Sequence, residues 1–213
     1  MYCYKCIVFC IFYFLFLILF LPLFMVKHNS SLLFIPNIIG YIRIFLILIS
    51  IHQNLFLFIC LYSVSVILDF FDGKCARKFN QTSVLGSVLD LVTDRLSTVV
   101  LCMRIITVCP SYRTSLSLFT FTDIMSHMLY FIAMCYRKKH HKEGYSLILR
   151  LYYNNFVLQT LCFGSETGFI GIYLECCGIK LGWPLEVLKG LIIIKSLVNI
   201  AHFQSGISIL ATV

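Results

Sequence analysis

Four aspartates lie close together in one polar stretch of an otherwise apolar chain, LDFFDGKCARKFNQTSVLGSVLDLVTDR. Asp69 and Asp72 are three residues apart, and Asp90 and Asp94 are four apart, so each pair shares one face of a helix. Two such faces brought together form an oxygen-rich pocket suited to a hard divalent cation, Mg²⁺ or Mn²⁺. Carboxylates are rare in membrane segments, which favours a functional site over a polar cluster that only caps helix ends.

The residues between the two pairs suit a ligand that carries phosphate. Gly73 and Ala76 are small, so a bulky group can approach the backbone. Arg77 has a planar guanidinium that matches two phosphate oxygens, although a lone arginine in a loop could equally serve to orient the helices. Ser83 adds a hydroxyl, and Gly86 leaves space one turn before the second aspartate pair.

The composition indicates that membrane helices position these groups. Of 213 residues, 60% are hydrophobic and only 12% are charged, and the mean hydropathy is +0.94. A soluble domain of this length could not bury so much apolar surface. The net charge of +8 resides mainly in short loops, where it orients membrane helices, so a nucleic-acid partner is excluded. The 11 cysteines lie mostly in or beside apolar runs and are expected to be small buried hydrophobes.

Apolar stretches of about the length needed to cross a bilayer predict an all-α fold, a polytopic membrane helical bundle. Six core transmembrane helices are expected within a membrane domain at residues 31–213, and an extra N-terminal hydrophobic segment occupies residues 1–30 as an additional helix or a signal-like segment. The seven stretches lie at about 7–26, 34–51, 54–71, 86–109, 115–136, 155–175 and 187–210.

The charges of the loops predict the orientation. If residues 27–33 face the cytosol, the loops at 72–85 and 137–150 do so as well, and they carry most of the lysines and arginines. That distribution follows the positive-inside rule. It puts all four aspartates near the cytosolic ends of the third and fourth spans, where a water-soluble substrate can reach them.

The aspartates and their neighbours form the pattern D-x2-D-G-x2-A-R-x8-G-x3-D-x3-D, with every fixed position present. This pattern resembles the CDP-alcohol phosphatidyltransferase family, and eight residues at fixed spacing make a specific signal. ARKFNQTSVLGSVLDLVTDR, PNIIGYIRI, RLYY and IIKSLVNIAH are similar to segments of the phosphatidylinositol synthase branch, in the same order, between about residues 35 and 205.

The resemblance implies six transmembrane helices, a homodimer, and an endoplasmic reticulum enzyme whose site opens to the cytosol. It implies CDP-diacylglycerol and myo-inositol as substrates, and phosphatidylinositol and CMP as products. By motif position, Asp94 would contact metal and act as the general base. The other metal ligands would be Asp69, Asp72 and Asp90, and the groups near the nucleotide lipid would be Gly73, Ala76, Arg77, Ser83 and Gly86.

Physical chemistry agrees with these implied roles. A diphosphate gains negative charge as the bond between its two phosphorus centres breaks, and divalent ions stabilise that charge. A carboxylate within hydrogen-bond range can take the proton of the attacking hydroxyl. Four acids packed together repel unless cations lie between them.

Polar residues elsewhere in the apolar spans are candidates for an acceptor or polar pocket. Asp123 and His127 are four apart on one helical face, and could seat inositol or form a hydrogen-bonded pair between helices. Arg43 could instead reach the headgroup region, and Arg95 could pair with its neighbour Asp94. The full candidate set is Arg43, Arg95, Asp123, His127, Arg150 and Lys195.

Three alternatives to an inositol transferase remain open. A member of the same family could use another acceptor: glycerol phosphate, serine, choline or inositol phosphate. A cation transporter could use the aspartates as an ion path, but its acids should be distributed through the membrane depth. An inactive membrane scaffold would not need the intact eight-position motif.

Overall fold

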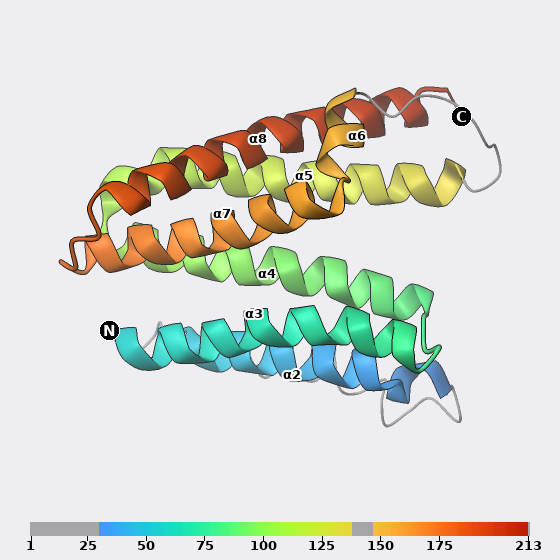
Figure 1. The fold of residues 1–213 in the computed structure, drawn as a ribbon, viewed down its shortest axis with the longest axis horizontal. Helices are drawn as coiled ribbons and strands as arrows, with labels where there is room; N and C mark the ends of the chain where they lie inside the picture. Colours follow the sequence, from blue (N-terminus) through green and yellow to red (C-terminus); the bar gives the residue numbers. More distant parts are fainter. Residues whose placement is uncertain (1–29, 138–146, 213) are drawn as a thin grey trace, which may run out of the picture. The chain divides into compact units, whose positions relative to one another are not determined.

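A computed structural model describes residues 30–137 and 147–212, and every regular element in these ranges is a helix (Figure 1). The all-α fold class predicted from the sequence is therefore confirmed. The chain forms two compact units, residues 1–94 and 95–213. The elements are the short 3₁₀ helices η1 (Ser30–Leu33) and η2 (Pro110–Tyr112) and the α-helices α2 (Ile35–Ser50), α3 (Leu55–Lys78), α4 (Val84–Val108), α5 (Arg113–Arg137), α6 (Leu147–Tyr152), α7 (Asn155–Cys176) and α8 (Trp183–Leu210).

The first unit contains α2, α3 and the first part of α4. Pro36 lies in the first turn of α2, where its missing N–H leaves no intrahelical bond unmade. α3 begins after Asn54, whose Oδ1 accepts a hydrogen bond from the backbone N–H of Leu57 at 2.9 Å. α2 and α3 pack along one another (Figure 1), and Tyr41 of α2 belongs to a small buried cluster with Leu89 of α4.

The turn between α3 and α4 is shorter than the sequence predicts. The apolar stretch ends near residue 71, but the helix continues to Lys78, because the polar residues that follow are compatible with helix and need not lie in lipid. Asn80, with φ 53°, then ends the helix, and the N–H of Gln81 bonds to the carbonyl of Ala76 at 2.9 Å. Ser83 caps α4 through a 3.0 Å bond from the N–H of Gly86.

The second unit contains the rest of α4 together with α5, α6, α7 and α8. α5 and α7 each pack along α8, and Gly206 permits the close approach of α8 to α5. A Cβ at that position would lie 3.1 Å from the backbone of Leu129 and Tyr130. α6, a six-residue helix in a segment that the sequence predicts as a loop, contributes Leu149 and Tyr152 to the core of this unit.

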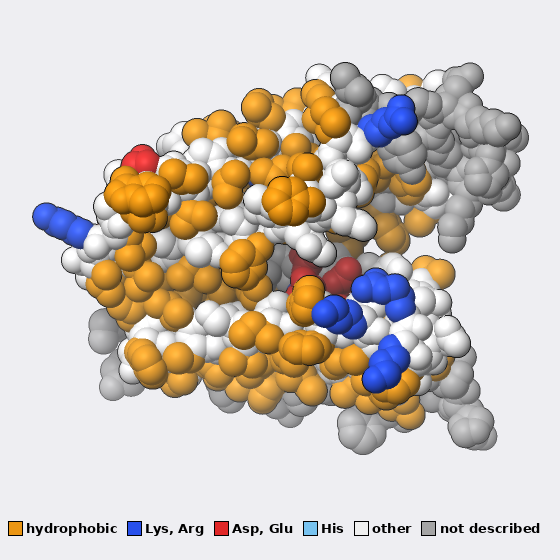
Figure 2. All heavy atoms as spheres, in the orientation of Figure 1, with side chains coloured by type: hydrophobic (Ala, Val, Ile, Leu, Met, Phe, Trp, Pro, Cys, Tyr) orange, Lys and Arg blue, Asp and Glu red, His pale blue; other side chains and the backbone are white. Residues whose placement is uncertain are grey.

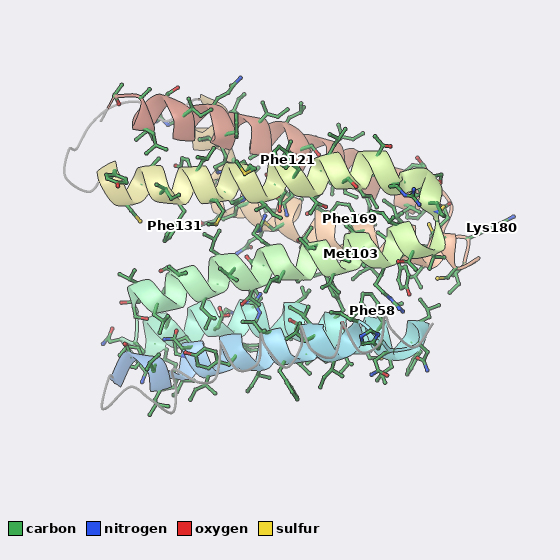
Figure 3. All side chains as sticks on the ribbon, turned by 180° about the vertical axis from the view of Figure 1, so that it is seen from behind. Phe58, Met103, Phe121, Phe131, Phe169 and Lys180 are labelled. Carbon is green, nitrogen blue, oxygen red and sulfur yellow. The ribbon has the colours of Figure 1, made fainter. Side chains whose placement is uncertain are left out.

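The described helices carry the apolar surface of a membrane protein. The segments Leu55–Lys78 and Pro110–Tyr136 are long and apolar enough to cross a bilayer, and Ile35–Ser50 is apolar but shorter. Hydrophobic side chains cover much of the face drawn in Figure 2, and Phe56 on α3 is 78% exposed. Figure 3 shows Lys180 extending away from the connection between α7 and α8.

Six of the seven apolar stretches predicted from the sequence correspond to helices, namely α2, α3, α4, α5, α7 and α8. The remaining stretch, at about residues 7–26, lies outside the described residues, as does most of the segment predicted as an N-terminal extension. The domain boundary after residue 30 stays a prediction.

Candidate functional site

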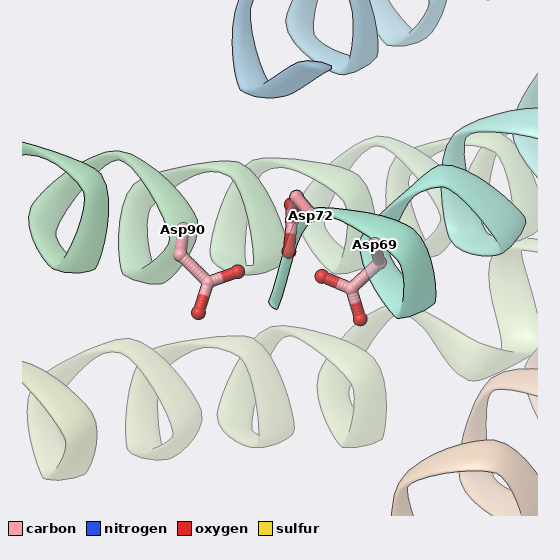
Figure 4. A group of neighbouring side chains, drawn as sticks. All are labelled: Asp69, Asp72 and Asp90. Carbon is pink, nitrogen blue, oxygen red and sulfur yellow. The ribbon is translucent and has the colours of Figure 1, made fainter. Parts of the chain in front are cut away.

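Three aspartates of the first unit bring their carboxylates together (Figure 4). Asp69 and Asp72 come from α3 and Asp90 from α4, and one oxygen of each lies within 4.8 Å of the others. The spacing of these residues in the helices explains the arrangement, since each pair on one helix shares a face. The Asp72 side chain is 12% exposed, against 41% for Asp69 and 52% for Asp90, so the cluster is open on one side. Carboxylate oxygens in this arrangement fit a divalent cation.

Arg43, on α2, lies at the centre of this acidic cluster. Its Nη1 is 2.6 Å from Asp69 Oδ1, 2.8 Å from Asp72 Oδ2 and 3.3 Å from Asp90 Oδ1. Its Nη2 donates to Asp94 Oδ1 at 2.7 Å. The Arg43 side chain is only 3% exposed. One buried guanidinium therefore contacts all four aspartates of the motif.

The position of Arg43 is the main feature that sequence reasoning missed. The sequence predicts that four acids repel unless cations lie between them, and it assigns Arg43 to an acceptor or polar pocket. The structure shows that the chain itself supplies one cation to the acids. The sequence has one arginine inside the apolar segment IIGYIRIFLI. An arginine in such a segment requires an anionic partner, and this requirement could have indicated the contact with the aspartates.

A pocket next to the aspartates is lined by the small and hydroxyl-bearing residues of the motif. Gly86 comes from the first turn of α4 and Ser83 directly precedes that helix, whereas Gly73 and Ala76 come from the last turns of α3. Arg77 is exposed, and its guanidinium lies about 3.6 Å from where a Cβ on Gly73 would be. The full lining is Pro36, Asn37, Gly40, Asp72, Gly73, Ala76, Gln81, Thr82, Ser83, Gly86, Ser87, Leu89 and Asp90.

Asn37 adds a polar group to this pocket that the sequence did not single out as a site residue. The residue is 1% exposed, and its Nδ2 donates to the carbonyl of Ser31 at 2.6 Å. Its Oδ1 is buried and has no hydrogen-bond partner among the described residues. A Cβ on Gly86 would lie 2.8 Å from this oxygen. The pocket therefore has an unused acceptor beside a glycine of the motif.

In the second unit, Asp123 of α5 is the centre of a separate polar cluster. Its Oδ2 is 2.5 Å from Arg95 Nη1, and its Oδ1 accepts from Asn199 Nδ2 of α8 at 2.9 Å. The Nδ1–H of His127 donates to the carbonyl oxygen of Asp123 at 2.9 Å. Asp123 is 1% exposed. Because both carboxylate oxygens have partners from other helical segments, the contacts favour an interhelical pair over a free group for seating a substrate.

The other two acceptor candidates of the second unit have different surroundings. Lys195 of α8 is 4% exposed and donates to Ser165 Oγ of α7 at 3.2 Å. The set of candidates predicted from the sequence is thus divided. Arg43 belongs to the acidic cluster, whereas Arg95, Asp123 and His127 lie together, with Lys195 near enough for its charge to act on the Asp123 carboxylate. Arg150 lies apart from them on an exposed face of α6.

Comparison with known proteins agrees with the motif. A "CDP-diacylglycerol--inositol 3-phosphatidyltransferase" of Saccharomyces cerevisiae is 40% identical over 160 residues, which cover 70% of this chain and 72% of the relative. The protein of the same description from Schizosaccharomyces pombe is 37% identical over 158 residues, 70% of this chain and 66% of that protein. The one from Homo sapiens is 31% identical over 204 residues, 84% of this chain and 94% of the relative.

No solved structure matches the chain at a significant level. The sequence profile of the CDP-alcohol phosphatidyltransferase family matches residues 7–148, a range that includes all four aspartates of the acidic cluster and begins within the segment predicted as an N-terminal extension. The chain belongs to the CDP-alcohol phosphatidyltransferase family.

Proposed function

We propose that this membrane protein transfers the phosphatidyl group of CDP-diacylglycerol to myo-inositol and so produces phosphatidylinositol and CMP. The observation that carries the proposal is the convergence of the motif's aspartates beside a pocket lined by the motif's small residues. The relatives named above support inositol as the acceptor, since each is described as an inositol 3-phosphatidyltransferase.

Asp69, Asp72, Asp90 and Asp94 would hold Mg²⁺ or Mn²⁺. Their oxygens are hard donors, and three of them come within 4.8 Å of one another, a spacing that suits ligands of a common ion. When bound, the metal would neutralise the charge that develops on the phosphate of the leaving CMP.

The pocket would receive the cytidine diphosphate part of the lipid. Gly73 and Gly86 allow a close approach to the two helices. The Ser83 hydroxyl accepts a hydrogen bond from Asn37 Nδ2 and can donate its own proton to the ligand. Ala76 lines the same wall. Arg77, exposed at the end of α3, suits the phosphate oxygens because its guanidinium can bind two of them at once.

Asp94 would act as the general base. A hydroxyl oxygen of inositol attacks the phosphorus that carries diacylglycerol, and the bond from that phosphorus to the bridging oxygen of CMP breaks. The hydroxyl proton passes to the Asp94 carboxylate, and CMP leaves with the electron pair of the broken bond. Asp94 is one helical turn from Asp90 on the same face of α4, so the base and the metal ligands can act on one substrate.

The proposal also includes a location and an assembly. The enzyme is expected in the endoplasmic reticulum membrane as a homodimer, with the acidic cluster on the cytosolic side. Lys74, Arg77 and Lys78 at the end of α3 support that orientation, since basic residues gather on the cytosolic side of membrane helices. Arg150 and Lys195 stay candidates for the acceptor side.

Product identity tests the function directly. Purified protein receives CDP-diacylglycerol, Mn²⁺ or Mg²⁺, and one labelled alcohol at a time: inositol, glycerol phosphate, serine, choline or inositol phosphate. Phosphatidylinositol formation that depends on metal and is lost in Asp94→Asn is the expected result. A lipid product from another alcohol, with none from inositol, would move the chain to another branch of the family. No lipid product at all, with cation flux into proteoliposomes, would favour a transporter.

A further inference from the structure

The guanidinium of Arg43 uses the same carboxylates that would bind the metal. Nη1 is within 3.3 Å of oxygens on Asp69, Asp72 and Asp90, which are the three residues whose oxygens meet closely enough to share an ion. A divalent cation would need lone pairs of these carboxylates at about 2.0–2.1 Å, the range for Mg²⁺. Such an ion and Nη1 cannot both lie at the centre of the three groups, because they carry charge of the same sign and need the same lone pairs.

Among the described residues, the ion pairs of the Arg43 guanidinium are all with the four aspartates. The Nε–H of Arg43 is buried and has no hydrogen-bond partner among the described residues. Both Nη atoms bond to carboxylates. A residue kept for packing or for helix pairing alone would be expected to satisfy its buried Nε–H as well. The Arg43 guanidinium thus bonds to the same carboxylates that would bind a metal ion.

Arg43 also engages the proposed base. Nη2 donates to Asp94 Oδ1 at 2.7 Å, a charge-assisted bond that occupies the carboxylate. While the bond is present, the guanidinium N–H occupies the Asp94 oxygen that an attacking hydroxyl would need to approach. A shift of the guanidinium away from Asp69, Asp72 and Asp90 would break the bond to Asp94 as well, because all four contacts belong to one planar group.

We propose that Arg43 is an internal counter-cation that competes with the divalent ion for the aspartate oxygens, lowers metal affinity, and releases Asp94 when metal takes its place. The inference rests on the metal site proposed above. Arg43 is in this sense a positioning residue, since it acts through the aspartates. In its absence the acids are expected to bind metal more tightly.

Direct binding of Mn²⁺ to the purified full chain in detergent, measured from the electron paramagnetic resonance signal of the free ion, tests the proposal. Arg43→Gln should bind Mn²⁺ at least about tenfold more tightly than the unchanged chain, because a like charge is removed from beside the ion. Arg43→Lys keeps the charge but loses the paired N–H donors of the guanidinium. Its Mn²⁺ affinity should lie between those of the unchanged chain and of Arg43→Gln. A gain of affinity is informative because general damage to the structure would lower it.

Two matched variants control the measurement. Arg104→Gln removes an arginine of α4 that lies over the ring of Tyr173 in the second unit, and should leave Mn²⁺ affinity unchanged. Asp90→Asn removes one acid and should weaken binding, which shows that the ion is bound at the acidic cluster.

Each outcome decides a separate question. If Arg43→Gln binds Mn²⁺ as tightly as the unchanged chain or more weakly, Arg43 does not compete with the metal. Its role would then be to hold the aspartates in place. If Arg43→Gln does not fold, Arg43→Lys decides: tighter binding supports competition, and unchanged or weaker binding overturns it. If neither the unchanged chain nor any variant binds Mn²⁺, with CDP-diacylglycerol present or absent, the proposed metal site itself fails.

Discussion

The two polar clusters of this protein differ in how their charges are balanced. In the first unit, Asp69, Asp72, Asp90 and Asp94 share a single guanidinium. In the second unit, the carboxylate of Asp123 has Arg95 on one oxygen and Asn199 on the other. The first cluster has an excess of negative charge and acidic side chains that are up to 52% exposed, whereas the Asp123 side chain is 2% exposed.

This difference in charge balance distinguishes a cluster that requires a bound cation from a cluster whose charges are already paired within the protein. Several carboxylates can lie close together in a membrane protein where bound cations offset their repulsion. Oxygens that are partly exposed to solvent can be reached by such cations. A buried acid whose oxygens are both bonded has little left to offer a substrate, and it contributes mainly to holding helices together. On this basis we propose that the first cluster is the reactive centre and that the second connects α5 to α8.

Replacing Asp94 should have the largest effect on catalysis. Asp94→Asn keeps the shape of the side chain but cannot accept a proton, so turnover should fall by about 10²–10⁴-fold, the usual contribution of a general base. Binding of CDP-diacylglycerol should be partly retained, because the pocket residues are unchanged. Steady-state turnover and lipid binding to the same purified variant measure the two effects. An equal loss of binding and turnover would argue against the role as base.

Replacing Asp123 should affect stability before catalysis. Asp123→Asn leaves the charge of Arg95 without its buried counter-charge, which costs about 3–5 kcal/mol when such a pair is broken. The midpoint of thermal unfolding in detergent should fall markedly. Glu175→Gln is the control, because the side chains of the Glu175–Lys189 pair are 41% and 26% exposed, and pairs near the surface contribute about 0–1 kcal/mol.

The opposite pattern would break the distinction between the clusters. If Asp123→Asn is as stable as the unchanged chain but needs much more inositol for half-maximal rate, Asp123 belongs to the acceptor pocket.

Local spacing made the acidic cluster predictable. Asp69 and Asp72 were expected on one helical face because helical periodicity depends only on neighbours in sequence. The six apolar stretches were likewise recognised from continuous hydrophobic runs, since membrane helices satisfy their own backbone groups. The helical continuation of α3 to Lys78 was not expected, because hydropathy reports where lipid ends rather than where a helix ends.

Pairing over long sequence distances could not be predicted from one sequence. Arg43 bonds to Asp94, 51 residues later, and Asn199 bonds to Asp123 across 76 residues. Which helix faces meet is decided by packing of the whole unit, and a single sequence carries no direct record of it. Arg43 could be recognised as a residue in need of an anion, but four acids and a headgroup region were all available to it.

Replacing Arg77 tests the first cluster through its nucleotide-lipid substrate. The loss of activity should be smaller than for Asp94→Asn and larger than for Gly86→Ala. Arg77→Ala should weaken the use of CDP-diacylglycerol by about 10–100-fold, since hydrogen bonds to charged groups contribute about 1.5–3 kcal/mol. The dependence on inositol should change little. Lys78→Ala removes the adjacent exposed charge and serves as the matched control. Kinetics with each substrate varied in turn separate the two dependences, and an unchanged apparent affinity for the nucleotide lipid would contradict the assignment.

The smallest effect on activity is expected from a substitution at Gly86, a glycine that lines the pocket. A Cβ there would lie 2.8 Å from Asn37 Oδ1 and 3.2 Å from Ser83 Oγ, so Gly86→Ala should displace these groups and narrow the pocket. We expect use of CDP-diacylglycerol to weaken by about tenfold, which corresponds to about 1.4 kcal/mol. Gly190→Ala is the control, because a Cβ on Gly190 of α8 meets nothing within 4 Å. If both variants have the same kinetics, the space beside Gly86 does not hold the nucleotide. If only Gly86→Ala is impaired while Mn²⁺ affinity is retained, the nucleotide pocket and the acidic cluster are separable parts of one site.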